Sequence, residues 1–497
     1  METVHENDDW RAQAVLTCAE MGAADAAAVA AGTAGIVLME NACAAVTRAI
    51  RARWAPRPTL MLCGPGNNGG DGFGVAIELA RYGWPVTLAL WGEPDSLCGD
   101  AAIMAGRWQG PIVKASPACL AGHGLVVDAL FGAGLSRDLN GLPLVLAEAL
   151  AAGRHDVVAI DVPSGLDGDT GEIRGAAAPA ALTVAFFRPK PGHLLSPGRG
   201  LCGELVVADI GIPPSVLDDI APATALNAPR LWQARLPRPT QEGHKYHRGH
   251  ALIVGGETTT GAARLAACSA LVVGAGLVTV VAPGGSFPVY AAALESVMVS
   301  DDDFAEVLAD TRKNAVLVGP GNGVGAATRE KAMLALTAGR RVVLDADALT
   351  SFADDRDTLF AATAACPSVL TPHDGEFARL FDATGDRLAR ARAGAAESRT
   401  VMALKGPETV IAAPDGHAVI ECGGPANLAT AGTGDVLAGL ITGLTAAGAT
   451  LFDAACMAAW IHATAASSAG VGLVSEALPH HVASVLAALP RGYTEAH

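Results

Sequence analysis

Short apolar runs alternate with helical patterns along the chain from about residue 58 onward. The runs are rich in β-branched residues and almost continuously apolar, which is typical of strands buried on both faces of a parallel sheet. In the first half we expect strands at Leu60–Cys63, Pro85–Leu90, Gly124–Leu130, Val157–Asp161 and Thr183–Phe187, helices at Asp71–Tyr82 and Gly141–Ala152, and earlier helices around 19–31 and 39–53.

The alternation stops in a proline-rich stretch, 211–243, and then begins again. A length of 497 residues would accommodate about three ordinary domains, but the pattern predicts two α/β domains, 10–215 and 244–492, joined by a linker, 216–243. The second series comprises strands at 249–256, Val316–Gly319, Arg341–Asp345, Ser368–Thr371 and Thr400–Lys405, followed by helices around 433–447 and 452–469.

The stretch CGPGNNGGDGFG (63–74) follows the first expected strand. It contains Gly64-x-Gly66-x-x-Gly69, the spacing of a dinucleotide-binding turn that leads into a helix. A plain pyrophosphate cradle needs no further polar side chains, yet Asn67, Asn68 and Asp71 lie in the same loop. The glycine spacing predicts a dinucleotide ligand, and the added polar residues indicate chemistry on it.

Polar residues also follow two later strands, and the carboxyl ends of parallel strands meet at one edge of a sheet, where ligands bind. Asn68, Asp128 and Ser164 offer hard oxygen ligands, and one carboxylate with two neutral oxygens suits K⁺ better than Zn²⁺. Asp161 is then free for proton transfer. The structural alternative is that Asp71 caps a helix and that Asp128 and Asp161 merely end strands.

In the second domain, ATAGTGDVLAG (429–439) predicts an anion-binding turn at a helix N-terminus, formed by Gly432, Thr433 and Gly434. Asp435 lies in the first turn of that helix. A carboxylate beside a phosphate costs electrostatic energy unless it acts on the acceptor, so we interpret Asp435 as a base for a hydroxyl under attack. Helix capping is the alternative.

Other polar groups follow strands of the second domain. His373, Asp374 and Glu376 follow one strand, and the segment from Lys405 to Thr409 follows another. That segment is either a loop for nucleotide phosphates or a hairpin turn with a solvated lysine. Asp345 and Asp347 either lie near a metal or cap a helix.

Composition narrows the function classes. The formal net charge is −16 with no basic block, which opposes nucleic-acid binding. The ten Cys include no C-x-x-C pair and no zinc-like spacing with His, so we interpret them as core residues in a reducing compartment. Neither a signal peptide nor a membrane span is expected, and the cytoplasm is the default location. We expect a homo-oligomer, in which the Ala-rich helices at 19–53 either form the subunit interface or cover the sheet.

Several motifs together resemble a known family. MENA (39–42), CGPGNNGGDG (63–72), VDALFGAGL (127–135) and AIDVPSGLDGDTG (159–171) resemble the NAD(P)HX epimerase domain. KYHRGHALIVGG (245–256), GAARLAA (261–267), GAGLVTV (274–280), VGPGNG (318–323), LDADAL (344–349), LTPHDGEFARL (370–380), LKG (404–406) and AGTGDVLAGLITGL (431–444) resemble the ribokinase-like NAD(P)HX dehydratase domain. In this order on one chain they resemble bifunctional NAD(P)H-hydrate repair enzymes.

The resemblance implies an N-terminal Rossmann-like three-layer αβα sandwich and a C-terminal ribokinase-like α/β domain. Such enzymes repair NADHX and NADPHX, in which water has added to the nicotinamide ring to leave a C6 hydroxyl. The first domain interconverts the R and S epimers with bound K⁺. The second dehydrates the S epimer with a nucleoside di- or triphosphate, ADP in bacterial members, giving AMP and phosphate, and Mg²⁺ is expected with the ADP.

Carried over by position, the resemblance implies these site residues. Asp161 and Asp435 are the expected catalytic residues, and Asn68, Asp128 and Ser164 the K⁺ ligands. Substrate is expected at Asn67, Asn68, Gly69, Gly70, Asp71, Gly132, Ala133, Gly134, Leu135, Ser136, Arg137, Asp138 and Asp161 in the first domain, and at Ala263, Gly321, His373 and Asp435 in the second. The nucleotide is expected at Lys405, Gly406, Pro407, Glu408, Thr409 and Gly434.

One position departs from the family pattern. The first glycine turn of the dehydratase domain commonly reads Gly-Gly-Ser, whereas this chain has Glu257 after Gly255 and Gly256. A carboxylate there would repel phosphate, which argues against phosphate contacts in that turn.

Two other functions stay open: a small-molecule kinase fused to a dinucleotide-binding regulatory domain, which would release a stable phosphorylated product, and a binding module without turnover.

Overall fold

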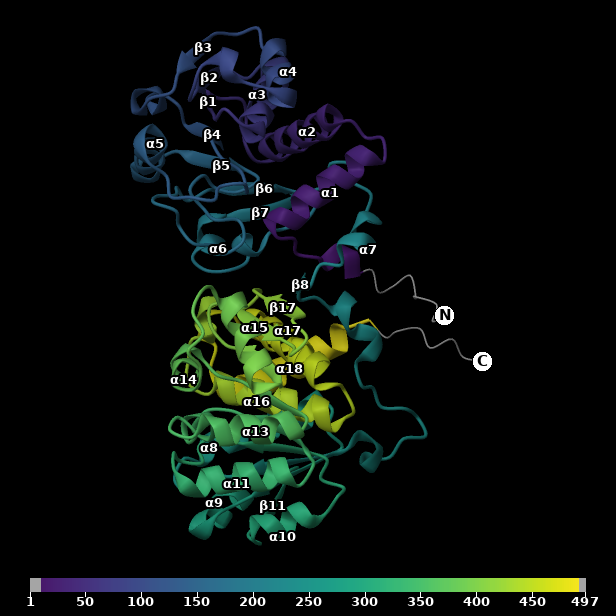
Figure 1. The fold of residues 1–497 in the computed structure, drawn as a ribbon. Helices are drawn as coiled ribbons and strands as arrows, with labels where there is room; N and C mark the ends of the chain where they lie inside the picture. Colours follow the sequence, from purple (N-terminus) through teal and green to yellow (C-terminus); the bar gives the residue numbers. More distant parts are fainter. Residues whose placement is uncertain (1–9, 491–497) are drawn as a thin grey trace. The chain divides into compact units, whose positions relative to one another are not determined.

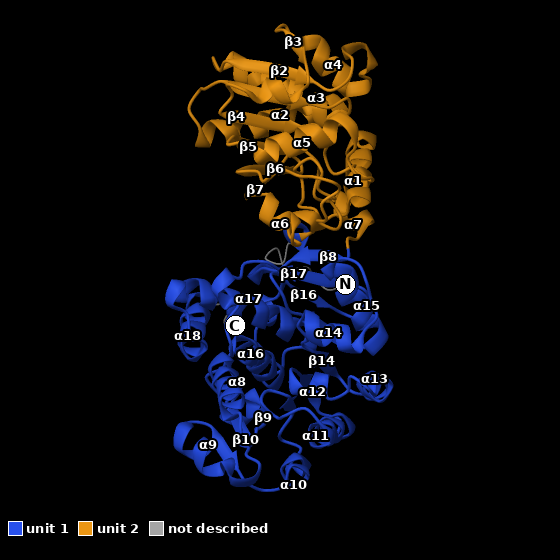
Figure 2. Ribbon diagram, turned by 90° about the vertical axis from the view of Figure 1, so that its left-hand side faces the viewer, with its two compact units in different colours: residues 1–13, 223–497 blue, residues 14–222 orange. Residues whose placement is uncertain are grey.

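The computed structural model describes residues 10–490, which form two compact units, coloured separately in Figure 2. The N-terminal unit comprises residues 14–222, and the C-terminal unit comprises 223–490 together with 10–13. Each is an α/β domain with a mainly parallel sheet, so the predicted fold class is confirmed.

The N-terminal unit contains a sheet of seven strands, all parallel. In sheet order they are β3 (Ile112–Lys114), β2 (Val86–Leu90), β1 (Thr59–Cys63), β4 (Leu125–Ala129), β5 (Asp156–Ile160), β6 (Leu182–Phe186) and β7 (Glu204–Ala208) (Figure 1). The chain reverses its direction across the sheet between β1 and β4, the place where doubly wound sheets bind ligands. The helices are α1 (Cys18–Ala30), α2 (Gly35–Arg53), α3 (Asn67–Arg81), α4 (Gly99–Arg107), α5 (Gly141–Ala152), α6 (Gly198–Leu201) and α7 (Val216–Ile220).

Successive side chains of β1 face opposite sides of the sheet, and each side is covered by a helical layer. Leu60 and Leu62 pack in one cluster with Leu146 and Leu150 of α5. On the other face, a Cβ atom at Gly72 of α3 would lie 2.7 Å from the Cys63 sulfur, so α3 lies directly on the strand. The unit is therefore the expected three-layer sandwich.

Helix α3 begins at Asn67, four residues before the predicted start. Its first turns carry glycines, which by themselves indicate a loop. A Cβ at Gly69 would lie 1.8 Å from the Gly64 carbonyl oxygen, and one at Gly64 would lie 2.0 Å from that of Leu130. No side chain fits at either position. The helix N-terminus is thereby held against the carboxyl ends of β1 and β4.

The C-terminal unit contains a ten-stranded sheet. Strands β9 to β15 are mutually parallel, and the β16–β17 hairpin, which the periodicity does not predict, extends the sheet antiparallel to β15. The order is β11 (Met298–Ser300), β10 (Leu277–Val281), β9 (His250–Val254), β12 (Ala315–Val318), β13 (Arg341–Leu344), β14 (Ser368–Leu370), β15 (Val401–Leu404), β16 (Thr409–Ala412), β17 (Ala418–Glu421) and β8 (Thr224–Leu226). The helices are α8 (Thr260–Val273), α9 (Phe287–Ala293), α10 (Phe304–Ala309), α11 (Ala326–Thr337), α12 (Asp347–Thr350), α13 (Arg356–Ala365), α14 (Asp374–Leu380), α15 (Arg387–Ser398), α16 (Thr433–Ala446), α17 (Leu451–Ala469) and α18 (Leu478–Ala488).

The segment interpreted as a linker, 216–243, is partly built into the C-terminal unit. Strand β8 pairs with β17, and the fully buried Trp232 donates its indole N–H to the Asn227 side chain over 3.0 Å. The boundary between the compact units therefore falls after Pro222 rather than at the predicted linker ends. A strand of three residues is too short to show a periodic pattern, and a single buried tryptophan shows none.

Helix α16 lies in the core of the C-terminal unit and is buried along almost its whole length. A Cβ at Gly439 would lie 2.3 Å from the Ala266 carbonyl oxygen, and one at Gly443 would lie 2.4 Å from that of Ala270. These glycines let α16 pack closely on the small residues of α8. The N-terminus of α16 thus reaches the carboxyl edge of the sheet.

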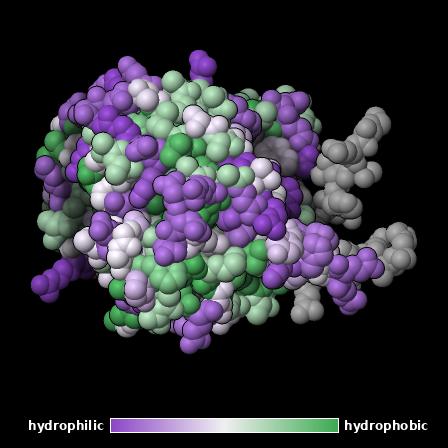
Figure 3. Space-filling view, turned by 90° about the horizontal axis from the view of Figure 1, so that it is seen from below, coloured by the Kyte–Doolittle hydropathy of each residue, from purple (hydrophilic) through white to green (hydrophobic). Residues whose placement is uncertain are grey.

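Among residues 10–490, no single helix is long and apolar enough to cross a membrane. Helices α1 and α2 meet the length and composition criteria only as a pair, and the chain bends by 120° between them. The face drawn in Figure 3 mixes purple hydrophilic and green hydrophobic residues. Single exposed apolar side chains of this kind are ordinary on a folded protein.

Candidate functional sites

A cavity of about 540 Å³ lies at the carboxyl ends of β1, β4 and β5. The loops after these strands supply much of its lining, so the structure brings the three predicted clusters together. The predicted residues in the lining are Asn67, Asn68, Asp71, Gly132, Ala133, Gly134, Leu135 and Asp161. Seven others are outside the lining: Gly69, Gly70, Asp128, Ser136, Arg137, Asp138 and Ser164.

Asp161 forms the centre of the polar contacts in this cavity. Its carboxylate accepts a hydrogen bond from Lys190 Nζ at 2.5 Å and another from the backbone N–H of Ala133 at 3.0 Å. Burial alone would raise the pKa of Asp161, but the Lys190 ammonium outweighs it and holds that pKa below its ordinary value. Asp161 is therefore ionised at neutral pH.

Lys190 and His193 fix the backbone around Asp161. His193 Nδ1 accepts from the Lys190 backbone N–H at 2.9 Å, so the proton of the neutral ring is on Nε2 and is donated to the Asp161 carbonyl oxygen at 2.7 Å. Burial lowers the pKa of His193 to about 4, which keeps the ring neutral. Asp161 itself has a φ of 67°, in the left-handed region that side chains rarely adopt.

Two further carboxyl groups line the cavity and behave in the opposite way. Burial raises the pKa of Asp71 well above its ordinary value, and the charge of Asp161 adds to the effect. Burial also raises the pKa of Asp25 on α1, to about 6. The cavity therefore combines one ionised carboxylate with carboxyl groups that retain protons more readily, the arrangement that general acid–base chemistry requires.

Sequence reasoning missed the contribution of α1 and of Lys190. Cys18, Met21 and Asp25 reach the cavity from a helix far from the strand ends, and nothing in their spacing marks them. Lys190 has a usable signal, because it lies four residues after β6 and is therefore a polar residue that follows a strand end.

The predicted cation ligands are linked through one short backbone segment. The Ser164 hydroxyl donates to Asp128 at 2.6 Å and accepts from the Phe131 N–H at 3.0 Å. A Cβ on the next residue, Gly132, would lie 3.2 Å from the Asn68 side-chain oxygen. Asn68, Asp128 and Ser164 thus lie around residues 131–132.

This cluster has polar groups that its protein contacts leave partly unsatisfied. Asp128 is buried, and burial raises its pKa, although hydrogen bonds from Ser164 and Leu130 act against the rise. The Asn68 amide nitrogen is buried and has no hydrogen-bond partner among the described residues. A buried carboxylate without a cationic neighbour fits the binding of a weakly hydrated monovalent cation.

In the C-terminal unit, Lys405 lies between a buried aspartate and the N-terminus of α16. Its ammonium donates to Asp345 at 2.6 Å, and a Cβ at Gly434 would lie 3.5 Å from the same nitrogen. Burial lowers the pKa of Lys405, but Asp345 and Glu376 outweigh it and the pKa is raised. A lysine charge and the free N–H groups of a 14-residue helix together favour a phosphate here.

Asp435 lies in the first turn of α16, as predicted. Its pKa is raised to about 6, mainly by burial and then by Asp345, with Asp347 adding to the rise and Lys405 opposing it. A carboxylate with a pKa near neutrality is poised to accept a proton and release it again. The position and the pKa both fit the interpretation of Asp435 as a base.

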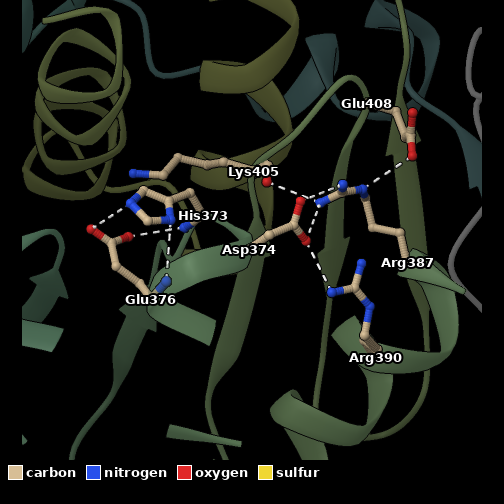
Figure 4. Close-up of polar contacts among 7 residues, drawn as sticks. All are labelled: His373, Asp374, Glu376, Arg387, Arg390, Lys405 and Glu408. Atoms are coloured by element: carbon tan, nitrogen blue, oxygen red, sulfur yellow. Dashed lines mark hydrogen bonds and ion pairs between the residues drawn. The ribbon is translucent and has the colours of Figure 1, made fainter. Parts of the chain in front are cut away.

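The loop after β15 is held by an ion-pair cluster, drawn in Figure 4. Arg387 donates to Asp374 at 2.8 Å and to Glu408 at 3.0 Å, and it also donates to the Lys405 carbonyl oxygen. A Cβ at Gly406 would lie 2.3 Å from the Arg387 guanidinium carbon. The Glu408 side chain is directed into this buried pair and so positions the loop.

His373 caps helix α14. Its Nδ1 accepts from the Glu376 N–H at 3.1 Å, and the Glu376 carboxylate accepts from the His373 N–H at 2.9 Å (Figure 4). The histidine side chain is half exposed, so a ligand can reach it. The short bridge between His373 and Lys405 brings the two strand-end segments together.

The remaining predicted residues of this unit differ in their surroundings. The Ala263 methyl group is fully buried in the core. Gly321 packs its carbonyl oxygen against Gly256, where a Cβ would lie 1.9 Å away. The exposed Glu257 side chain lies beside Gly284, where a Cβ would be 3.0 Å from its Oε1, so this carboxylate is directed toward the turn after β10.

Asp345 and Asp347 are engaged by the protein. Asp345 pairs with Lys405, and Asp347 accepts from the Gly323 N–H at 2.8 Å. Within residues 10–490, no group of three or more His, Cys, Asp or Glu side chains is placed to hold a metal ion.

Family models match both units of the chain. Residues 35–192 match the family described as YjeF-related protein N-terminus, and residues 251–487 match the family described as NAD(P)H-hydrate dehydratase. A bifunctional NAD(P)H-hydrate repair enzyme from Moorella thermoacetica is 37% identical, with 92% of each chain covered. One from Thermofilum pendens is 35% identical, with 91% of this chain and 92% of the relative covered.

Solved structures are similar to part of the chain. An ADP/ATP-dependent NAD(P)H-hydrate dehydratase from Bacillus subtilis, co-crystallized with ATP/Mg²⁺, is 28% identical with a TM-score of 0.46 and covers 52% of this chain and 96% of that chain.

The two sheets, with polar clusters at their carboxyl ends, define a two-domain α/β enzyme of the nucleotide-handling class. Two further findings identify the family: the order of the two family matches along the chain, and the relatives that align over both domains. The chain belongs to the family of bifunctional NAD(P)H-hydrate repair enzymes.

The buried pair of Lys190 and Asp161 makes a testable contribution to stability. Lys190→Met leaves the Asp161 carboxylate buried without its cation, so we expect the free energy of unfolding at pH 7 to fall by about 3–5 kcal/mol. Adding Asp161→Asn removes the uncompensated charge and should recover part of that loss. Urea denaturation, followed through hydrogen exchange of the β1 and β4 amides, reports the N-terminal unit separately.

Arg107→Met is the matched control, because its ion pair with Glu40 leaves both side chains 45% exposed. Its removal should cost at most about 1 kcal/mol. An equal loss in the free energy of unfolding for Lys190→Met and Arg107→Met would contradict the role of the buried pair.

Proposed function

We propose that this chain repairs hydrated NADH and NADPH through two activities. The N-terminal unit interconverts the R and S forms of NADHX and NADPHX at C6. The C-terminal unit dehydrates the S form to NADH or NADPH while ADP is converted to AMP and phosphate. The juxtaposition of Lys405, Asp435 and the N-terminus of α16 carries the proposal, because it combines a phosphate site with a base.

In the N-terminal unit, the hydrated ring is proposed to lie in the cavity beside Asp161. Epimerisation requires reversible loss of configuration at C6, through departure of the hydroxyl or through ring opening. Either route moves a proton to and from an oxygen or a ring nitrogen. The ionised Asp161 accepts it, and Lys190 keeps that carboxylate ionised.

The cluster of Asn68, Asp128 and Ser164 is the proposed K⁺ site. The buried Asp128 carboxylate supports it, since hydrogen bonds from Ser164 and Leu130 reach this carboxylate but no cationic side chain compensates its charge. The cation would supply charge that fixes the loop after β4. These three residues would hold it through oxygen atoms, the ligand type that hard cations prefer.

In the C-terminal unit, Asp435 removes the proton from the C6 hydroxyl as that oxygen attacks the terminal phosphorus of ADP. The bond between that phosphorus and the bridging oxygen breaks, and AMP leaves. The C6–O bond then breaks to release phosphate, and loss of the C5 proton restores the ring double bond. Phosphorylation converts hydroxide, a poor leaving group, into phosphate.

The nucleotide phosphates are proposed to lie against Lys405 and Gly434. Lys405 and the N–H groups of α16 supply positive charge where the phosphoryl group is transferred. Asp345 fixes the Lys405 ammonium there. Mg²⁺, when bound with the nucleotide, would offset the repulsion between the phosphates and the nearby carboxylates Asp347 and Glu376.

Purified hydrate tests the proposal directly. The S epimer with ADP should recover the absorbance of the reduced nicotinamide ring and release one phosphate per ring restored. Asp435→Asn should lower kcat for dehydration by about 10²–10⁴-fold.

With Asp161→Ala, the R epimer should remain unconsumed while the S epimer is still repaired. A stable phosphorylated product without reduced nicotinamide would instead identify a small-molecule kinase.

The raised pKa of Asp435 predicts a pH dependence. The base must be ionised, so kcat/KM for dehydration should rise with pH through about 6 and level off above it. Asp347→Asn removes a negative charge that raises this pKa, so the acid limb should move to lower pH. Arg379→Gln, an exposed change on α14, should leave the pH profile in place. An unmoved acid limb in Asp347→Asn would contradict the assignment.

The proposed K⁺ site predicts an effect on stability as well as on rate. At equal ionic strength, KCl should raise the Tm of the N-terminal unit and its epimerisation rate relative to choline chloride. Ser164→Ala should increase the K⁺ concentration needed by about tenfold or more. Burial raises the pKa of Asp128, so protons compete with the cation and the effect should weaken as pH falls. Equal Tm values in both salts would exclude the site.

A further inference from the structure

A second cavity of the C-terminal unit lies at the opposite edge of the sheet from Lys405 and Asp435. It has a volume of about 700 Å³ and is bordered by residues at the amino ends of β9, β12 and β13 and by the last residues of α16. Since parallel strands place their two ends on opposite edges, this cavity is separate from the proposed dehydratase site.

The charged side chains that line this cavity are all cationic. Arg312, Arg340 and Arg341 border it, and no Asp or Glu is among the lining residues. A neighbouring cavity of about 440 Å³ shares His247 with it, adds Arg238 and Arg248, and is likewise free of acidic lining residues. This concentration of positive charge is unexpected in a chain whose formal net charge is −16.

Protein contacts satisfy these guanidinium groups only in part. Arg312 pairs with Asp310 at 2.9 Å. Arg341 donates to the carbonyl oxygens of Thr445 and Ala449, which caps the end of α16 but supplies no full negative charge. Arg340 donates to the Leu308 carbonyl at 3.2 Å, and its Nε is buried without a hydrogen-bond partner among the described residues.

One histidine that lines the cavity is uncharged. The pKa of the His250 ring is lowered to about 4, mainly by burial and then by Lys313, while Asp310 opposes the shift. The ring is therefore neutral and bonded to the Thr279 hydroxyl at 2.7 Å. Asp310, the acidic partner of Arg312, is not among the residues that line the cavity.

Aromatic rings stand beside the cations. Tyr246 is half exposed, and the Arg312 guanidinium lies 5.8 Å from the centre of its ring. The rings of His244 and His247 are 3.7 Å apart. Gly339 and Gly448 also border the cavity, and a Cβ at either would contact nothing within 4 Å.

We propose that this cavity is a second nucleotide site, which takes a nucleoside di- or triphosphate with its phosphates on Arg340 and Arg341 and its base against Tyr246. Guanidinium groups bind phosphate oxygens in pairs of hydrogen bonds, so each of the two arginines in the lining would take one phosphate of a di- or triphosphate. A base stacks on an exposed aromatic ring irrespective of its identity. This site is independent of hydrate turnover.

Hydrogen exchange of the full chain with and without ATP tests the proposal, because it reports each site locally. We expect ATP to slow exchange in residues 245–250, 311–314 and 339–341, in addition to any protection at the start of α16. In R340Q/R341Q the three cavity segments should lose this protection, and α16 should respond as in the wild type. Protection at α16 alone would overturn the second site and leave the proposed dehydratase site intact.

Two further variants keep the test decisive if R340Q/R341Q is poorly folded. R48Q/R154Q removes the same charge from exposed positions of the N-terminal unit and should leave all ATP protection unchanged. Tyr246→Ala changes an exposed side chain and should weaken ATP binding at the cavity by about tenfold. Inorganic tripolyphosphate should bind more weakly than ATP and be insensitive to Tyr246→Ala. Equal binding of ATP and tripolyphosphate would overturn the nucleotide assignment.

Discussion

Both candidate sites depend on helices that approach a neighbouring backbone more closely than any side chain would allow. In α3, the glycines of the first turns lie against the ends of β1 and β4, with Gly69 in contact with the Gly64 carbonyl. In α16, Gly439 and Gly443 lie against the backbone of α8. The cost is the lower helix propensity of glycine, about 1 kcal/mol per residue. The gain is that two helix N-termini are held at the carboxyl edges of the sheets, where ligands bind.

The two sites differ in their electrostatics because their lysines pair with carboxylates in different positions. In the N-terminal unit, Lys190 contacts Asp161 directly, and the pKa of that carboxyl group is lowered. In the C-terminal unit, Lys405 is bonded to Asp345, and Asp435 keeps a pKa raised to about 6. Burial raises the pKa in both cases, so the partner of the lysine decides whether the neighbouring carboxylate is permanently ionised or ready to exchange a proton.

Much of the fold was predictable because most of its strands are short, apolar and buried on both faces. Helix α5 was predicted at its observed bounds, Gly141–Ala152, since it is rich in Leu and Ala, which favour helices. Strand β8 and the β16–β17 hairpin were not, because they lie at one end of the sheet, where pairing with a neighbour decides the structure. The early start of α3 was also missed, because glycine and asparagine indicate a loop unless the contacts that require them are known.

The sequence by itself determined the two α/β series, the polar residues that end their strands and the placement of Asp435 in a first helical turn. These features are local, since they depend on periodicity and on neighbours within a few residues. Only the tertiary structure decided which charges meet. Lys190 and Asp161 are 29 residues apart and Lys405 and Asp345 are 60 apart, and no local pattern specifies such pairs. It also showed that Glu408 stabilises Arg387, because the orientation of a buried side chain depends on packing from segments distant in the sequence.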